Sequence, residues 1–199
     1  MAVEEDFWHW FLHHQHELLS FEQDRDRIFD SLASQLRKID SRLVFEFGPR
    51  EVKREFVISA DGILAAFPAV VSLVDAAPDM PDWKITAFRP RRAAMSIIEI
   101  QEKRVDPKLV EFSLLHNDQV AGIRLFIPSF QEEDAGWKAI GYLLLDEALG
   151  EYDVETRLGL IKMYSPNAST AETRYPFELL PRLFDQLIAK IEGKSGKPS

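Results

Sequence analysis

Apolar residues recur at helical spacing over the first forty positions of the chain. On a helical wheel with about 100° per residue, one stripe consists of Phe7, Phe11, Leu18 and Phe21, with Trp8 and Trp10 flanking it. A second stripe over residues 24–39 consists of Ile28, Leu32, Leu36 and Ile39. The pattern predicts helix throughout this region but does not decide whether it forms one helix or two.

The period changes to two after residue 42. Segments 43–48 and 54–59 alternate apolar and polar residues, and GPREVK between them supplies turn residues, so we expect a β-hairpin. FPAVVSLVDAAP then predicts a helix, for which Ser59 and Asp61 are candidate N-caps, although Pro68 favours a later start. Residues 83–90 predict a further strand.

The second half of the chain repeats this order. Residues 110–115 and 120–128 read as strands, 132–150 as a helix ending at Gly150, and 156–164 as another strand, with 95–100 as an extra strand between the copies. A last helix follows at 176–193. The expected fold class is α+β, with two ββαβ-like units forming antiparallel sheets, helices packed on one face, and N-terminal and C-terminal helices.

Composition supports a stable core. The 199 residues are 46% hydrophobic and 29% charged, and they include 14 Phe and four Trp. We expect a single α+β domain over 1–192, with subdomains 1–92 and 93–192 as the alternative division, and a disordered tail at 193–199. The absence of cysteine excludes disulfides, thiolate nucleophiles and zinc ribbons, and it fits a reducing cytoplasm.

Charge narrows the classes of partner. The net charge of −9 disfavours nucleic-acid backbones. The acidic N-terminus lacks the basic start of a secretory signal, and no apolar run reaches the roughly 20 residues that span a bilayer. The sequence therefore predicts a cytoplasmic protein that binds neither nucleic acid nor membrane, and no cofactor is expected.

Four stretches together carry a family resemblance. FWHWF, REFVISADG, AFRPRR and LLLDEALGEYDVETRLG are similar to an uncharacterised family of bacterial proteins, a domain of unknown function. The likeness extends from about Phe7 to about Phe184. It implies a bacterial cytoplasmic α+β protein but no activity, so no functional residue is carried over from it.

The histidines near the N-terminus are the most metal-like feature. His9, His13 and His16 share one helical face, opposite the apolar stripe on which His14 lies. Two histidines spaced i, i+4 can chelate zinc or nickel, but the HExxH spacing is absent, and a true metal site usually draws a further ligand from a second element. The pattern favours a solvated row with His14 at the core edge over a metal site at His9, His13 and His16.

An acidic cluster crowds the end of the helix predicted at 132–150 and the residues after it. Its members are Asp146, Glu147, Glu151, Asp153 and Glu155. Negative charge is unfavourable at a helix C-terminus, so the cluster predicts a compensating cation or a function. It could bind Mg²⁺ or Ca²⁺, although the EF-hand spacing is missing, or supply an acid–base pair of the glycosidase kind. The favoured interpretation is structural, with Arg157, Lys138 or the RPRR cluster as partners.

Three arginines follow the strand predicted at 83–90. Arg89, Arg91 and Arg92 suit carboxylates or phosphates, so this loop is a candidate anion site. The alternative is structural: the arginine loop and the acidic cluster could pair with each other.

Known catalytic motifs are missing from the chain. It has no G-x-S-x-G elbow, Walker A loop or GxGxxG. We expect a binding or regulatory module that recognises another protein through an acidic or aromatic surface, and we lean against an enzyme. The alternative is a hydrolase or metal-dependent enzyme that uses Asp146, Glu147, Glu151 and Asp153. Homodimerisation through a sheet edge or the final helix stays open.

Overall fold

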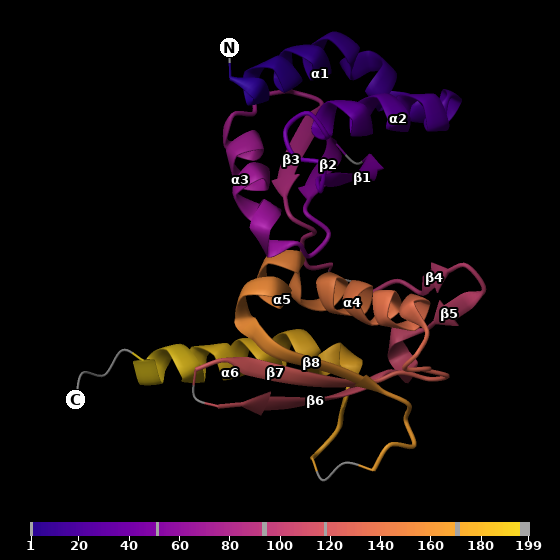
Figure 1. Cartoon of the computed structure of the whole chain (residues 1–199), viewed down its shortest axis with the longest axis vertical. Coiled ribbons are helices and arrows are strands. Elements are labelled where there is room, and N and C mark those ends of the chain that lie inside the picture. Colours follow the sequence, from indigo (N-terminus) through magenta and orange to yellow (C-terminus); the bar gives the residue numbers. More distant parts are fainter. Residues whose placement is uncertain (1, 51, 93–94, 118, 170–171, 196–199) are drawn as a thin grey trace. The chain divides into compact units, whose positions relative to one another are not determined.

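A computed structural model describes residues 2–50, 52–92, 95–117, 119–169 and 172–195 (Figure 1). The chain divides into two compact units, Met1–Arg89 (unit 1) and Pro90–Ser199 (unit 2). The subdomain limits expected from the sequence place the division after residue 92 instead of residue 89. Within the described residues, no helix is long and apolar enough to cross a membrane.

The described residues of unit 1 form a three-stranded sheet and three α-helices. Its elements are α1 (Val3–Leu19), η1 (Phe21–Gln23), α2 (Arg25–Leu36), β1 (Val44–Arg50), β2 (Arg54–Ser59), η2 (Leu64–Ala66), α3 (Phe67–Asp75) and β3 (Trp83–Ala87). The strand order is β1-β2-β3, with β1 antiparallel and β3 parallel to β2. The N-terminal region is therefore two helices, separated by the single 3₁₀ turn η1.

Aromatic side chains form the core of unit 1. Phe11 of α1 is fully buried and stacks on Phe56 of β2, with ring centroids 5.1 Å apart. Trp8 is also buried, and its indole Nε1 donates a hydrogen bond of 2.8 Å to the carbonyl of Leu73 in α3. This bond satisfies the polar group of a core tryptophan. The apolar stripe of the first helix thus packs on the sheet as its spacing predicts.

The proposed N-caps of the third helix are wrong. Ser59 accepts a hydrogen bond from the backbone N–H of Asp61 at 3.0 Å, so it stabilises a turn in place of a helix end. Asp61 and Gly62 both have positive φ, and this turn separates β2 from the helical segment. Helix α3 begins at Phe67 with Pro68 in its first turn, as the proline indicates.

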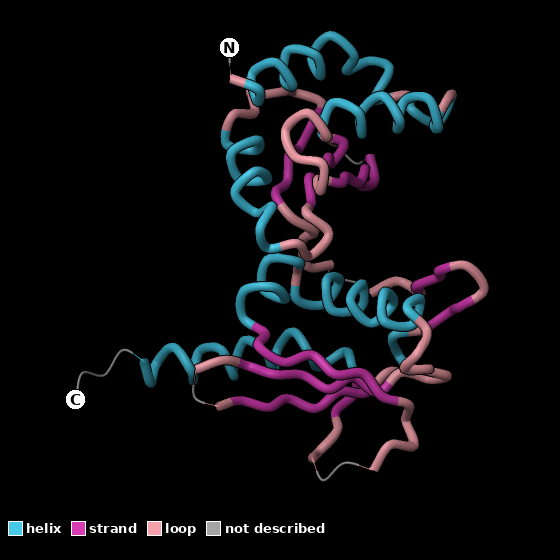
Figure 2. The backbone as a smooth tube through the Cα atoms, in the orientation of Figure 1, coloured by secondary structure: helices cyan, strands magenta, loops and turns pink. Residues whose placement is uncertain are grey.

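In unit 2, the part that the structure describes forms a four-stranded sheet, a small hairpin and three α-helices. Its elements are β4 (Ile98–Ile100), β5 (Lys103–Val105), η3 (Pro107–Leu109), β6 (Glu111–His116), β7 (Ala121–Phe126), α4 (Ala135–Leu149), α5 (Glu151–Arg157), β8 (Leu158–Tyr164), β9 (Tyr175–Pro176), η4 (Phe177–Leu179) and α6 (Leu180–Ser195). The order of the larger sheet is β8-β7-β6-β9, and Figure 2 shows its long strands side by side.

The two faces of this sheet differ in character. Strand register places Phe112, Ile123 and Leu125 on one face, where they join a core built with α4 and α6. The opposite face carries Arg124, Phe126 and, on the neighbouring strand, Lys162 and Tyr164. Alternation along each strand therefore separates a helix-covered face from a face with charged and aromatic side chains.

The expected α+β class is confirmed, and the ββαβ order occurs in both units. The hairpins are antiparallel as expected, but the last strand of each repeat lies parallel to the second, so both sheets are mixed. The sequence pattern did not predict β5, β9 or α5. Helix α6 continues to Ser195, so residues 193–195 of the predicted tail are helical, and 196–199 lie outside the described residues.

Candidate functional site

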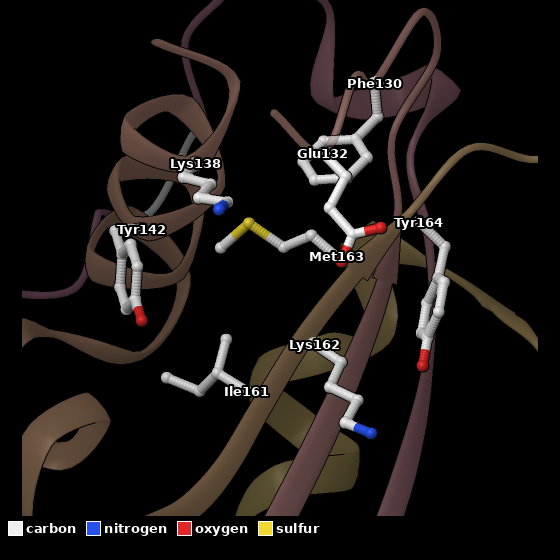
Figure 3. Close-up of a pocket in the computed structure, with 8 residues that line it drawn as sticks. All are labelled: Phe130, Glu132, Lys138, Tyr142, Ile161, Lys162, Met163 and Tyr164. Atoms are coloured by element: carbon white, nitrogen blue, oxygen red, sulfur yellow. The ribbon is translucent and has the colours of Figure 1, made fainter. Parts of the chain in front are cut away.

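A cavity of about 350 Å³ lies in unit 2 between helix α4 and strand β8 (Figure 3). Its lining comes from three segments: Phe130 and Glu132 after β7, Lys138 and Tyr142 on α4, and residues 161–164 of β8. Figure 3 shows Ile161 and Met163 pointing toward α4, while Lys162 and Tyr164 lie on the other side of the strand. The volume falls in the range typical of ligand and side-chain pockets.

The cavity extends along the outer edge of β8. Alternate side chains of a strand point to opposite faces, so a cavity above one face would touch every second residue. Here four consecutive residues line the cavity. In the part of the chain that the structure describes, β8 pairs with β7 alone. Its other edge is therefore open to a further strand.

One hydrogen bond fixes which backbone groups point outward. Ile127 donates from its N–H to the carbonyl of Tyr164 at 2.9 Å, so Tyr164 faces β7. The N–H and C=O of one strand residue point to the same side, and that side alternates along the strand. Lys162 therefore also faces β7, whereas Ile161 and Met163 direct their N–H and C=O groups toward the open edge.

A glycine on α4 shapes the cavity. A Cβ atom added at Gly141 would lie 2.3 Å from the sulfur of Met163, so the thioether occupies the space that any other residue would fill. Glycine in a helix interior costs about 0.5–1 kcal/mol relative to alanine. Gly141 is buried, and the close approach of Met163 explains why this position is glycine.

Charge at the cavity is unbalanced. Lys138 and Lys162 are both exposed, and neither forms an ion pair with any residue in the described ranges. Glu132 is the one acidic residue in the lining. Tyr164 is held in place by stacking on the buried Phe126, with ring centroids 5.8 Å apart. The cavity thus combines aromatic walls with a small excess of positive charge on an acidic chain.

The acidic cluster has structural partners. Asp146 and Glu151 are buried, and each has a partner within the chain. Glu147 accepts a hydrogen bond from the backbone N–H of Ser96 at 3.0 Å. Asp153 pairs with Arg91 at 2.6 Å and with Arg157 at 2.9 Å. Two of the carboxylates proposed as catalytic, Glu147 and Asp153, therefore hold segments of unit 2 together.

The prediction that these carboxylates lie unfavourably at a helix C-terminus holds for Asp146 and Glu147 at the end of α4, but it is wrong for Glu151 and Asp153. Gly150, with φ of 81°, ends α4 and also begins α5. Glu151 and Asp153 lie in the first turn of α5, where the helix dipole favours negative charge. Glu155 differs from its neighbours, since burial and the adjacent Glu151 carboxylate raise its pKa above the ordinary value.

The three arginines proposed as an anion site are engaged within their own units. In unit 1, Arg89 forms ion pairs with Glu46 and Asp61. In unit 2, Arg91 pairs with Asp153 and Asp185 and donates from Nε to the carbonyl of Leu149 at 2.7 Å.

The backbone N–H of Arg92 donates a hydrogen bond of 2.8 Å to the carbonyl of Glu147, which belongs to the acidic cluster. Together with the ion pair between Arg91 and Asp153, this contact confirms the alternative in which the arginine loop and the acidic cluster pair with each other. The arginine loop therefore holds the end of α4 and the start of α5 in place.

The histidines divide as the helical wheel predicts. His9, His13 and His16 are exposed, whereas His14 is half-buried and stacks on Trp10 with ring centroids 4.6 Å apart. Among the described residues, no group of three or more histidine, aspartate or glutamate side chains is arranged to hold a metal ion. The exposed row on α1 therefore belongs to no such group within the described part of the chain.

Sequence analysis did not identify the cavity beside β8. Its residues come from a loop, a helix and a strand, and none forms a motif. The alternation of LGLIKMY predicts the strand, and Lys162 within it is the kind of residue that marks an edge. Comparisons with protein-family models, with curated proteins and with solved structures find no match to this chain.

Proposed function

We propose that this chain is a binding module that recognises another protein by accepting an extended segment along the outer edge of β8. The observation that carries the proposal is the cavity of about 350 Å³ that follows this edge. In strand addition, backbone hydrogen bonds supply affinity and pockets for alternate side chains supply specificity. The outward N–H and C=O groups of Ile161 and Met163 offer the backbone hydrogen bonds, and the adjacent cavity offers a side-chain pocket.

The aromatic surface supports this proposal better than an acidic surface does. Phe130, Tyr142 and Tyr164 line the cavity, and aromatic side chains are enriched at protein interfaces. Several of the cluster's carboxylates, by contrast, have cationic or backbone partners within unit 2. The resemblance to bacterial proteins and the absence of cysteine keep a bacterial cytoplasmic location as part of the proposal.

The hydrolase alternative has less support. The raised pKa of Glu155 next to Glu151 is the kind of perturbation that an acid–base pair requires. However, the cavity of about 220 Å³ near Asp153 is lined by charged residues that already form ion pairs. Arg91 and Arg157 both pair with Asp153 there. We therefore do not propose an enzymatic role for Asp146, Glu147, Glu151 or Asp153.

The test is selection of ligands from a random library of 12-residue peptides displayed on phage, followed by hydrogen exchange on the bound protein. We expect selected peptides to slow exchange of the Ile161 and Met163 amides at least about tenfold, because these donors point to the open edge. The Lys162 amide, which faces β7, should change little. A library that yields no binder, or binders that leave both amides unprotected, would contradict the proposal.

A pocket variant provides the matched comparison. Gly141→Ala should displace the Met163 thioether and weaken the selected peptides about tenfold or more, as expected for a lost anchor pocket. The control is Gly193→Ala on α6, where an added Cβ meets no atom within 4 Å. Both changes replace a helical glycine, so a loss confined to Gly141→Ala would arise from the cavity itself.

A further inference from the structure

We infer that the segment bound at β8 is acidic, with an apolar side chain flanked by aspartate or glutamate. This inference rests on the proposed function, since it names the chemistry of the partner at the same edge. Its basis is the pair of lysines beside the cavity, which stand apart from the ion-pair networks of the described chain.

The geometry of β8 predicts where each kind of side chain would lie. A strand added beside β8 would place its side chains alternately on the two faces of the sheet. A residue on the α4 face would meet Ile161 and Met163 and fill the cavity. The residues before and after it would lie on the face of Lys162 (Figure 3). The expected pattern is therefore acidic, apolar, acidic.

A second lysine adds positive charge on the α4 side of the cavity, beside the position of the apolar side chain. Lys138 is exposed on α4 and lines the cavity together with Tyr142. Glu132 is the single carboxylate in the lining, so the lining carries two ammonium groups and one carboxylate. Complementary charge across an interface steers encounter and rejects wrong partners. A lysine-rich segment would meet like charges on both faces of β8.

A second copy of this chain fits the edge less well. Strand β8 reads LGLIKMY, so it contains one lysine and no acidic residue. Pairing two such strands would bring two Lys162 side chains to one edge with no carboxylate from either strand. Lysine on an edge strand is a common device against such self-association. We therefore assign the edge to a different chain.

The experiment compares peptides selected by the wild-type protein and by the double variant Lys138→Glu, Lys162→Glu from the same 12-residue library. We expect the wild type to enrich aspartate and glutamate on both sides of an apolar residue, and the variant to enrich lysine and arginine there. Wild-type peptides should bind the variant at least about tenfold more weakly. The control Lys108→Glu, Lys190→Glu changes two exposed lysines away from the cavity by the same charge.

The outcomes separate the inference from the proposed function. Peptides that protect the Ile161 and Met163 amides without an excess of acidic residues would overturn the inference and leave strand addition standing. Peptides that protect neither amide would overturn strand addition itself. Sedimentation should show a monomer. A dimer that protects these amides would overturn the assignment of the edge to a different chain. An equal loss of binding in the control variant would show that only the net charge of the protein matters, and it would overturn the role of Lys138 and Lys162.

Discussion

At the scale of single residues, the hydrogen-bond and ion-pair partners of Arg91 decide its role. Arg91 uses Nε and both terminal nitrogens for three different acceptors: the Leu149 carbonyl, Asp153 and Asp185. Burial lowers the pKa of Arg91, but these carboxylates together outweigh it and raise the pKa above its usual value. Lysine could not reproduce this forked arrangement. An arginine that looks available for phosphate in the sequence is therefore a structural connector.

The raised pKa of Glu155 predicts that the stability of the folded protein depends on pH. Its pKa is raised in the folded protein, so the protonated form is favoured and the stability that protonation adds is present at low pH. That stability is lost as pH rises through the raised pKa. We expect Glu155→Gln to raise Tm by about 1–3 °C at pH 7 and to have little effect below pH of about 4. Thermal unfolding followed by circular dichroism across this range is the measurement.

Asp40 provides the opposite case as a control. The guanidinium of Arg42 donates to its carboxylate and lowers the pKa of Asp40 to about 2. The stability from this depressed pKa is present above the ordinary value and is lost as pH falls toward 2. Asp40→Asn should therefore lower Tm at pH 7 and have a diminishing effect in acid. If both variants shifted Tm in the same direction at pH 7, the assigned pKa directions would be wrong.

At the scale of elements, strand β8 has one satisfied edge and one open edge. Its parallel pairing with β7 follows from the helical crossover through α4 and α5. Lys162 and Tyr164 use their backbone groups in that ladder, and Ile161 and Met163 do not. The element therefore carries a row of donors and acceptors that no described strand uses.

Amide exchange in the free protein tests this orientation. The N–H groups of Ile161 and Met163 should exchange about a hundredfold faster than those of Lys162 and Tyr164, because only the latter pair donates into the ladder. Residue-resolved exchange by NMR is the measurement. Equal protection at all four positions would show that another segment covers the edge, and the alternating assignment would then fail.

Sequence reasoning succeeded for elements with local periodicity and failed where one glycine or one pairing decided the outcome. The stripe through Phe7 and Phe11 predicts the buried face of α1 correctly. Helix α5 was missed because Gly150 after a long apolar helix reads as a terminator, and EYDVET has no clear apolar stripe. The parallel partner of β8 depends on contacts far apart in the sequence, which a local pattern does not encode.

At the scale of the whole molecule, the described residues form two separate hydrophobic cores. One is formed within unit 1 around Phe11 and Phe56, and the other within unit 2 around Phe112 and Leu144. Each core is built from residues of its own ββαβ repeat and of the elements that flank it: α1 and α2 in unit 1, and β4, β5 and α6 in unit 2. The repeated element order expected from the sequence thus corresponds to two centres of packing.

A core truncation should therefore act mainly on its own unit. Leu144 is fully buried on α4, and Leu144→Ala should cost about 2–5 kcal/mol of stability in unit 2. Amides of β6 and β7 should exchange faster, while those of β2 should change much less. Leu32→Ala on α2 is the matched truncation in unit 1 and should give the reverse pattern. Equal acceleration in both units for either variant would show that they unfold as one.

By itself, the sequence determined the long helices, the β1–β2 and β6–β7 hairpins, the repeated order and the division of the histidines into packed and exposed sets. Each of these depends on periodicity within a few turns or strand residues, where backbone geometry fixes which side chains share a face. Only the tertiary structure decided that β8 is an edge, that Met163 fills the space over Gly141, and that Arg91 joins the acidic cluster. These features bring together residues distant in the chain, because strand order and close packing are set by the whole core.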